Sequence, residues 1–313
     1  MSISKEIERL QQAKKDIGDA IVRKGGSVSG TIDTYAKSVM ALGDVSFRTA
    51  IDIVNKSDAM NVDLTMISPK NETSLESLFY RNRNIRKIDA SNWDTSNITS
   101  LTFAFSGMRN LESVDFADWD VSNVTNFYAL FGSCASLQII DISKWDTTKS
   151  TNFGFCFANK DYLTQLDVSN LKTQNCTMFH AMFNDCPYVT QLDVSNFDMA
   201  NAIDTGLMFS YCRSITSLDI SNFDLSNVKN IEYMFRGTVK LATLKTTNLK
   251  LPNIDMRLIG FNESPLAVDS IVGLLNALPQ SDKGYSFQIG SNNIAKLSDG
   301  QKAIATDKGW TLI

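Results

Sequence analysis

The amino-acid sequence predicts an α/β fold: a solenoid with parallel strands, preceded by an N-terminal helical hairpin and closed by an α/β C-terminal cap. The segment ITSLDISNFDLSNVKNIEYMFRGTVK, residues 215–240, matches five earlier segments at a constant spacing of 26 residues. The six copies fill residues 85–240 without an insertion or a deletion. A fixed period of about 20 to 50 residues is typical of solenoids, in which each repeat stacks only on its neighbours.

Each copy opens with a short apolar segment that predicts a strand. In one copy the apolar residues at the first, fourth and sixth positions are Leu163, Leu166 and Val168, and the last two alternate with polar residues. This alternation is the pattern of a half-buried strand. Stacked copies would place such strands side by side in a parallel sheet, about 4.8 Å apart.

Two rows of large side chains recur in register. One follows the strand in a turn-forming cluster of Ser, Asn and Asp, and the other lies on a segment that we expect to form a short helical turn. Stacking would bury each ring on the next, so we interpret both rows as core rather than as a cofactor site. The first row is Trp93, Trp119, Trp145, Leu171, Phe197 and Phe223, and the second is Phe105, Phe131, Phe157, Phe183, Phe209 and Phe235.

The string LDVSNFD, followed downstream by Met-Phe, resembles the BspA-type leucine-rich-like repeats of bacterial surface proteins and of phages that infect such bacteria. The resemblance covers residues 59–250, because a degenerate copy with Val62, Asp63 and Phe79 in matching positions precedes the six regular ones. It implies a leucine-rich-repeat-like solenoid with a binding or adhesive role. No catalytic residues follow from it.

Residues 1–44 are expected to form a helical hairpin, and residues 45–58 a connector into the solenoid. Two interpretations of the hairpin stay open: it caps the first coil, or it attaches the chain to other virion proteins and makes it a homo-oligomer. Part of it, IVRKGGSVSGTIDTYAKSVMAL, resembles N-terminal modules of phage tail and fibre proteins. The apolar seam that would oligomerise has heptad-like spacing and consists of Ile3, Ile7, Leu10, Ile17 and Ile21.

Residues 251–313 are expected to form a cap that covers the apolar edge of the last coil. Its predicted elements are a helix that starts at Ser264-Pro265, a strand at Tyr285–Ile289, and a last helix capped by Ser298. The string IGSNNIAKLSDGQKAIATDKGWTLI resembles a C-terminal module of phage tail and baseplate-associated proteins.

Charge argues against nucleic acid as a partner. Residues 85–240 contain 11 basic and 17 acidic residues, a net charge of −6, whereas a phosphate-binding surface needs clustered Lys and Arg. No targeting segment and no membrane span are visible. We therefore expect assembly in the host cytoplasm as part of a phage virion that acts outside the cell.

The sequence offers little chemistry, and we expect no enzyme activity, cofactor or metal site. Its one histidine, His180, lies inside a repeat. Cys134, Cys186 and Cys212 share a register with Lys160, so their place in the repeat explains why these cysteines recur. The ladder Asp89, Asp115, Asp141, Asp167, Asp193 and Asp219 would bring like charges together. Either hydrogen bonds, for example from the Ser two residues later, or a ligand such as cations or sugar hydroxyls must offset this.

The third position of the repeat varies, and we select it as the candidate ligand-binding row. We expect it to bind bacterial surface polysaccharide or protein, as part of a phage tail or fibre protein. The alternatives are a purely structural virion protein, a head fibre or tail scaffold that binds neighbouring subunits, and a bacterial surface adhesin. The candidate residues are Lys87, Ser113, Gln165, Gln191 and Ser217, and the same row includes Ile139 and Thr243.

Overall fold

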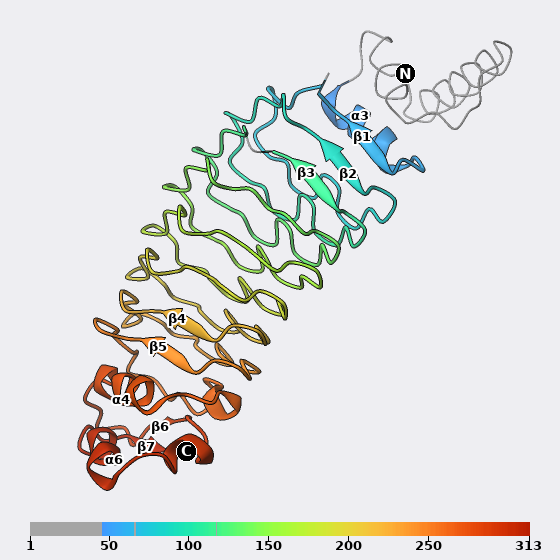
Figure 1. Ribbon diagram of the computed structural model, residues 1–313. Coiled ribbons are helices and arrows are strands. Elements are labelled where there is room, and N and C mark those ends of the chain that lie inside the picture. Colours follow the sequence, from blue (N-terminus) through green and yellow to red (C-terminus); the bar gives the residue numbers. More distant parts are fainter. Residues whose placement is uncertain (1–45, 66, 117) are drawn as a thin grey trace, which may run out of the picture.

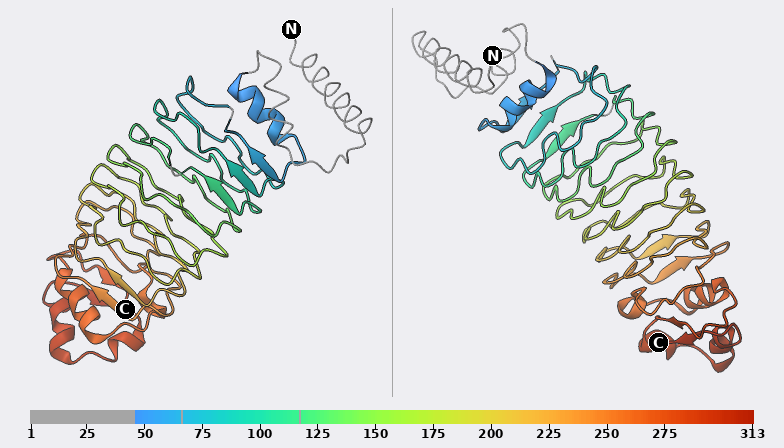
Figure 2. Two further views of the ribbon diagram at one scale, coloured as in Figure 1. Left: turned by 45° about the horizontal axis from the view of Figure 1, so that its top comes forward. Right: turned by 180° about the vertical axis from the view of Figure 1, so that it is seen from behind.

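The computed structural model describes residues 46–65, 67–116 and 118–313. Successive 26-residue coils stack into an elongated solenoid, with the short strands along one side and the helices gathered at the two ends of the described chain (Figures 1 and 2). The hairpin predicted for residues 1–44, with its apolar seam, lies outside the described residues.

Parallel strands form where the repeat pattern predicts them. Strands β1 (Asn61–Asp63), β2 (Lys87–Asp89) and β3 (Ser113–Asp115) make one parallel sheet, and β4 (Ser217–Asp219) pairs with β5 (Thr243–Lys245). Each residue pairs with the residue 26 positions away, which confirms the predicted register. The sheet is not continuous. Between β3 and β4, the strand positions of the described coils are joined by a single bridge, Gln165 to Gln191.

The segment that carries the Phe row is not a helical turn, as the sequence analysis expected, but a stacked turn. In one coil the N–H groups of Leu75, Ser77, Phe79 and Arg81 donate to carbonyls of the next coil. Ser77 and Arg81 adopt a positive φ, and the same two positions do so in the following coils. The neighbouring coil offers acceptors at every second residue, so these N–H groups bond between coils instead of to the residue four positions earlier.

The two predicted rows lie in the core, and their inward orientation is confirmed. Phe183 is 1% exposed and stacks between Phe157 and Phe209, with ring centroids 5.9 and 5.8 Å away. Trp93 and Trp119 stack at 5.4 Å. Phe116 then contacts both Trp119 and Trp145, at 6.1 and 5.3 Å, and takes the space that a third stacked indole would fill.

The first coil is capped by helix α3 (Phe47–Asn55), where the sequence analysis expected only a connector. Ser46 caps the start of the helix, and Ala50, Ile51 and Val54 are buried. The Phe47 ring packs edge-on against Trp93, with centroids 5.1 Å apart, and Asn55 Nδ2 donates to the carbonyl of Leu78. The missed signal is the spacing of these apolar residues on one helical face.

Because α3 covers the first coil, we expect residues 1–44 to be dispensable for folding. A chain lacking residues 1–44 should melt within about 2 °C of the full-length protein, since it keeps the contacts of α3 with Trp93 and Leu78. If the predicted apolar seam joins subunits, light scattering should show an oligomer for the full-length chain and a monomer for the truncated one. A monomeric full-length chain at micromolar concentration would contradict the oligomerisation hypothesis.

At the other end, residues 251–313 continue the stack with longer helices. The Phe261 ring, in η1 (Phe261–Glu263), stacks on Phe235 at 4.4 Å. Helix α4 (Val268–Ala277) begins three residues after the predicted Pro265, because the N–H of Ala267 still bonds between coils to Ala242. The remaining elements are β6 (Ser286–Phe287), α5 (Ser291–Ile294), α6 (Asp299–Thr306), capped by Ser298, and β7 (Thr311–Leu312), which pairs with β6.

Candidate functional site: the strand face

The side of the solenoid that carries the strands is its candidate binding surface. We call it the strand face and define it by the second, third and fifth positions of each copy and by the residue that precedes the first position. In β2 the third and fifth positions, Lys87 and Asp89, are exposed while Ile88 between them is buried. The whole third row is exposed, and it consists of Lys87, Ser113, Ile139, Gln165, Gln191, Ser217 and Thr243.

Hydrogen bonds explain the Asp ladder of the strand face. In one coil Asp167 Oδ1 accepts from the N–H of Ser169 at 3.0 Å and from its hydroxyl at 2.6 Å. These bonds hold the pKa of Asp167 below its usual range. The same pair of bonds forms at Asp89, Asp141 and Asp193, so the first of the two explanations given for the ladder is present in the structure.

A second acidic row at the adjoining corner is satisfied in the same way. Ser96 donates to Asp94, Thr148 to Asp146, and Ser226 to Asp224. The described residues contain no group of three or more His, Cys, Asp or Glu side chains arranged to hold a metal ion. One oxygen of each carboxylate named above is used in the turn, which makes these residues part of the scaffold.

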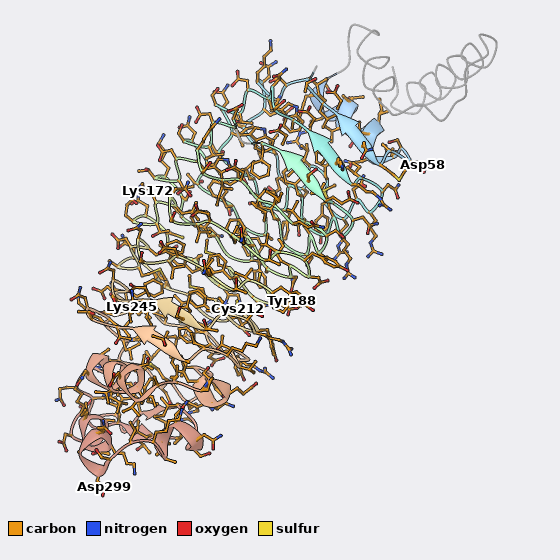
Figure 3. The ribbon with its side chains drawn as sticks, in the orientation of Figure 1. Asp58, Lys172, Tyr188, Cys212, Lys245 and Asp299 are labelled. Carbon is orange, nitrogen blue, oxygen red and sulfur yellow. The ribbon has the colours of Figure 1, made fainter. Side chains whose placement is uncertain are left out.

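The ion pairs of the strand face lie near its ends, whereas exposed apolar side chains lie beside the Asp ladder at its centre. Arg86 pairs with Glu112 at 3.3 Å near one end, and Lys245 pairs with Asp219 at 3.3 Å near the other. Between them, Ile139 is 74% exposed, Tyr162 62% and Tyr188 56%. Figure 3 shows Tyr188 at one edge of the coil stack and Lys172 at the opposite edge. Large apolar side chains this exposed on successive coils are typical of an interaction site.

The repeat pattern predicts the third row as a binding site but does not single out the two tyrosines. Tyr162 and Tyr188 each precede the first apolar residue of a copy, and the parallel bridge that joins Gln165 to Gln191 holds their coils in register. The sequence shows that the tyrosines are 26 residues apart, but this spacing does not show that they are exposed. Among the candidates, the structure brings Gln165 and Gln191 together and leaves Lys87 and Ser217 near opposite ends of the array.

The remaining titratable groups of the repeats are accounted for by packing. His180 Nδ1 lies 3.0 Å from Asp204 Oδ1, and the histidine ring packs on Phe155. Cys134 and Cys186 each donate to the carbonyl of the residue 29 positions earlier, and burial raises the pKa of Cys186 to about 12. Lys160, in the same register, is fully buried and donates to the carbonyls of Phe131 and Ala158.

A half-buried aromatic strip runs along the stacked turns. Tyr80, Phe103, Tyr128, Phe155 and His180 follow one another on successive coils with ring centroids 5.2–5.7 Å apart. The large side chain alternates between two adjacent positions, and the other position is small, as in Tyr128-Ala129 and Gly154-Phe155. This alternation lets the rings interlock, so packing accounts for the strip.

Stacked 26-residue coils, parallel strands and an exposed variable row define a repeat protein of the leucine-rich-repeat-like type. The family model described as "Mycoplasma protein of unknown function, DUF285" matches residues 73–192 and again residues 129–248, which together span more than half of the chain. The chain therefore belongs to the DUF285 family. No curated protein matches it.

Among solved structures, the chain is similar to a leucine-rich repeat protein of T. pallidum, with 13% identity, a TM-score of 0.29, and coverage of 82% of this chain and 79% of that one. The TLR13–ssRNA13 complex also gives 13% identity, with a TM-score of 0.31 and coverage of 82% and 33%. The functional domain of InlJ from Listeria monocytogenes, which includes a cysteine ladder, gives 15% identity and a TM-score of 0.18, with coverage of 67% of this chain and 59% of that one. At these TM-scores the fold assignment rests on the strand register of the chain itself.

Among the described residues, no helix has the length and apolar character needed to span a membrane.

Proposed function

We propose that the protein is a non-enzymatic binding protein whose strand face binds polysaccharide or protein on a bacterial cell surface. The observation that carries the proposal is the contrast within each strand segment. The fourth position is apolar in every copy and buried in all but one, where Val114 is half-buried, whereas the third position is exposed and varies from Lys87 through Ile139 to Thr243. A scaffold that is constant inside and variable on one exposed row suits selective binding.

The acidic and ionic features support binding more than catalysis. The carboxylates of the strand face recur in register and are engaged by turn hydrogen bonds, so none of them stands out as a general acid or base. The exposed tyrosines Tyr162 and Tyr188 at the centre of the strand face are of the residue type that is enriched in interface cores.

We further propose that this binding protein is a phage virion component, a tail or fibre protein made in the host cytoplasm that acts outside the cell. The proposal is supported by the resemblance of the segments near both ends of the chain to modules of phage tail proteins. A bacterial surface adhesin would use the same strand face. A purely structural virion protein would bind neighbouring virion subunits instead.

The test uses the full-length chain and a panel of intact bacterial cells and extracted surface glycans. We expect the wild-type protein to bind at least one of them, and the double variant Gln165→Glu/Gln191→Glu to bind at least about tenfold more weakly. The two added carboxylates lie on the strand face beside Asp167 and Asp193, where they disturb a contact by charge and by lost amide donors. The melting temperature should fall only slightly, because both glutamines are exposed and water screens the repulsion between the added carboxylates.

A matched control adds the same two charges elsewhere. Gln174 lies at the turn corner and Gln280 follows α4, so Gln174→Glu/Gln280→Glu should bind as wild type does. A folded protein that binds no cells or glycans but does bind purified virion proteins would replace the proposal by the structural role. Equal weakening by both double variants would show a general charge effect and remove the strand face from the proposal.

A further inference from the structure

Two adjacent coils carry the same exposed sequence. Residues 162–167 read YLTQLD and residues 188–193 read YVTQLD, one repeat length later. The corresponding segments of the other copies read NIRKID, NLESVD, SLQIID and SITSLD, so the Tyr-x-Thr-Gln-x-Asp pattern is specific to these two coils. We call the two segments the paired motifs.

The structure places the paired motifs in register on the strand face. Gln165 and Gln191 form a parallel bridge, and the N–H of Thr190 donates to the carbonyl of Thr164 at 3.5 Å. All the polar members of both motifs are exposed, and the leucines between them are buried. Each motif therefore offers one tyrosine ring, one hydroxyl, one amide and one carboxylate to solvent, and the second motif repeats the set one coil further along.

These groups match the chemistry of a sugar ring. The C–H face of a pyranose packs on a tyrosine ring, which supplies apolar area and a polar hydroxyl. Glutamine amides both donate and accept hydrogen bonds, so they suit neighbouring sugar hydroxyls. Asp167 and Asp193 use Oδ1 within their turns, and Oδ2 is the oxygen that would accept from a sugar hydroxyl.

Charge decides between kinds of glycan. The paired motifs contain no Lys or Arg, and three ladder carboxylates, Asp141, Asp167 and Asp193, lie along them on the same face. An anionic polysaccharide would be repelled by these carboxylates. Lys144 lies near Asp141, but its ammonium group is already paired with Asp118. An uncharged polysaccharide meets no such cost.

Repetition decides between a glycan and a protein. Two identical sets of groups related by a translation suit a ligand that repeats along its own length, because successive weak contacts then act together. Successive units of an extended polysaccharide have that property, and the surface of a folded protein does not.

We propose that the paired motifs form two equivalent subsites for successive sugar units of a neutral polysaccharide, with Tyr162 and Tyr188 as the stacking platforms. The proposal deepens the function proposed above and rests on it for the biological source of the ligand. It adds the class of ligand and the two residues that contribute most to binding.

The first experiment is gel electrophoresis of the full-length chain through gels that contain dextran, laminarin or galactomannan as neutral probes and alginate or hyaluronate as anionic ones. We expect at least one neutral probe and neither anionic probe to retard the protein. Tyr162→Ala and Tyr188→Ala should each weaken the retardation about tenfold, and the double variant about a hundredfold. Tyr80→Ala is the matched control, because Tyr80 is 42% exposed but lies in the aromatic strip of the stacked turns.

Unchanged melting temperatures show that the variants fold, and both tyrosines are exposed enough for that to be expected. Retardation by none of the neutral probes overturns the proposal, as does retardation that the double tyrosine variant retains. Stronger retardation by alginate or hyaluronate than by the neutral probes overturns the assignment of the ligand as uncharged.

A second experiment separates this proposal from the proposed function. Cells that bind the wild-type chain are treated with periodate, which oxidises vicinal diols of glycans, or with proteinase K, which removes surface proteins. Loss of binding after periodate alone, together with loss in the double tyrosine variant, supports both proposals. Loss after proteinase K alone, or full binding by the tyrosine variant, overturns the glycan subsites and leaves strand-face binding to be judged by the Gln165→Glu/Gln191→Glu variant.

Discussion

Replacing Phe183 by alanine should lower the free energy of unfolding by about 3–5 kcal/mol, the cost of truncating a large aromatic side chain in a packed core. Phe183 is 1% exposed and its ring is stacked on both sides, by Phe157 and Phe209. Truncation removes both ring contacts and leaves a cavity between two coils. Urea-induced unfolding of the two proteins measures the difference.

The damage should spread beyond one coil, because each repeat of a solenoid is stabilised by its interfaces with both neighbours. Amide hydrogen exchange should therefore accelerate in the coils of Phe157 and Phe209 and much less in the C-terminal helices. Phe155→Ala is the matched control, since Phe155 is only half-buried in the aromatic strip and should cost less. Equal losses for the two variants, or a loss below about 1 kcal/mol for Phe183→Ala, would contradict the assignment of the Phe row as the core.

The 26-residue period predicts the coil length, the parallel register and the buried rows, because all three follow from which residues repeat at a fixed spacing. It does not predict the backbone of the stacked turns. Phe103 and Ala129 share the positive-φ position with Ser77, so this position carries no glycine signal that a sequence could show. The conformation there is set by hydrogen bonds to the next coil, such as Ser77 N–H to the carbonyl of Thr102, and these exist only in the assembled stack.

The candidate site divides in the same way. Exposure of the third row follows from alternation with the buried fourth position, so Gln165 and Gln191 could be selected from the sequence. Tyr162 and Tyr188 lie before the alternating segment, where periodicity does not tell an exposed aromatic residue from a buried one. Their exposed fractions, 62% and 56%, depend on how the backbone passes from one coil to the next, and the repeat pattern does not specify this.

Lys160 places a charged side chain in a register that holds cysteine in three other coils, at Cys134, Cys186 and Cys212. The thiols of Cys134 and Cys186, on the coils on either side, each donate a hydrogen bond to the carbonyl of the residue 29 positions earlier. The ammonium group of Lys160 makes the equivalent hydrogen bond to the carbonyl of Phe131. A charge in this position has lost its hydration, and burial therefore lowers the pKa of Lys160, against the opposing effect of the neighbouring Cys134 and Cys186.

The stability of the wild-type protein relative to Lys160→Met should therefore rise with pH. Below the lowered pKa of the buried lysine, the folded and unfolded chains are both protonated, and the relative stability is constant. Between that pKa and the ordinary value of 10.5, the unfolded chain binds the proton and the folded chain does not. In that window the folded protein gains up to about 1.4 kcal/mol per pH unit.

Urea unfolding of both proteins at several values between pH 7 and pH 10.5 measures this difference. Burial raises the pKa of the Cys156 and Cys186 thiols, which lowers the stability of both proteins as the pH rises above the thiol value of 9.0 in the unfolded chain. Taking the difference between wild type and Lys160→Met removes most of that shared effect. Lys172→Met, which removes an exposed lysine, controls for the loss of one positive charge. A difference between wild type and Lys160→Met that stays constant across the whole range would show that Lys160 keeps its proton on its two carbonyl acceptors, and that their hydrogen bonds outweigh the lost hydration.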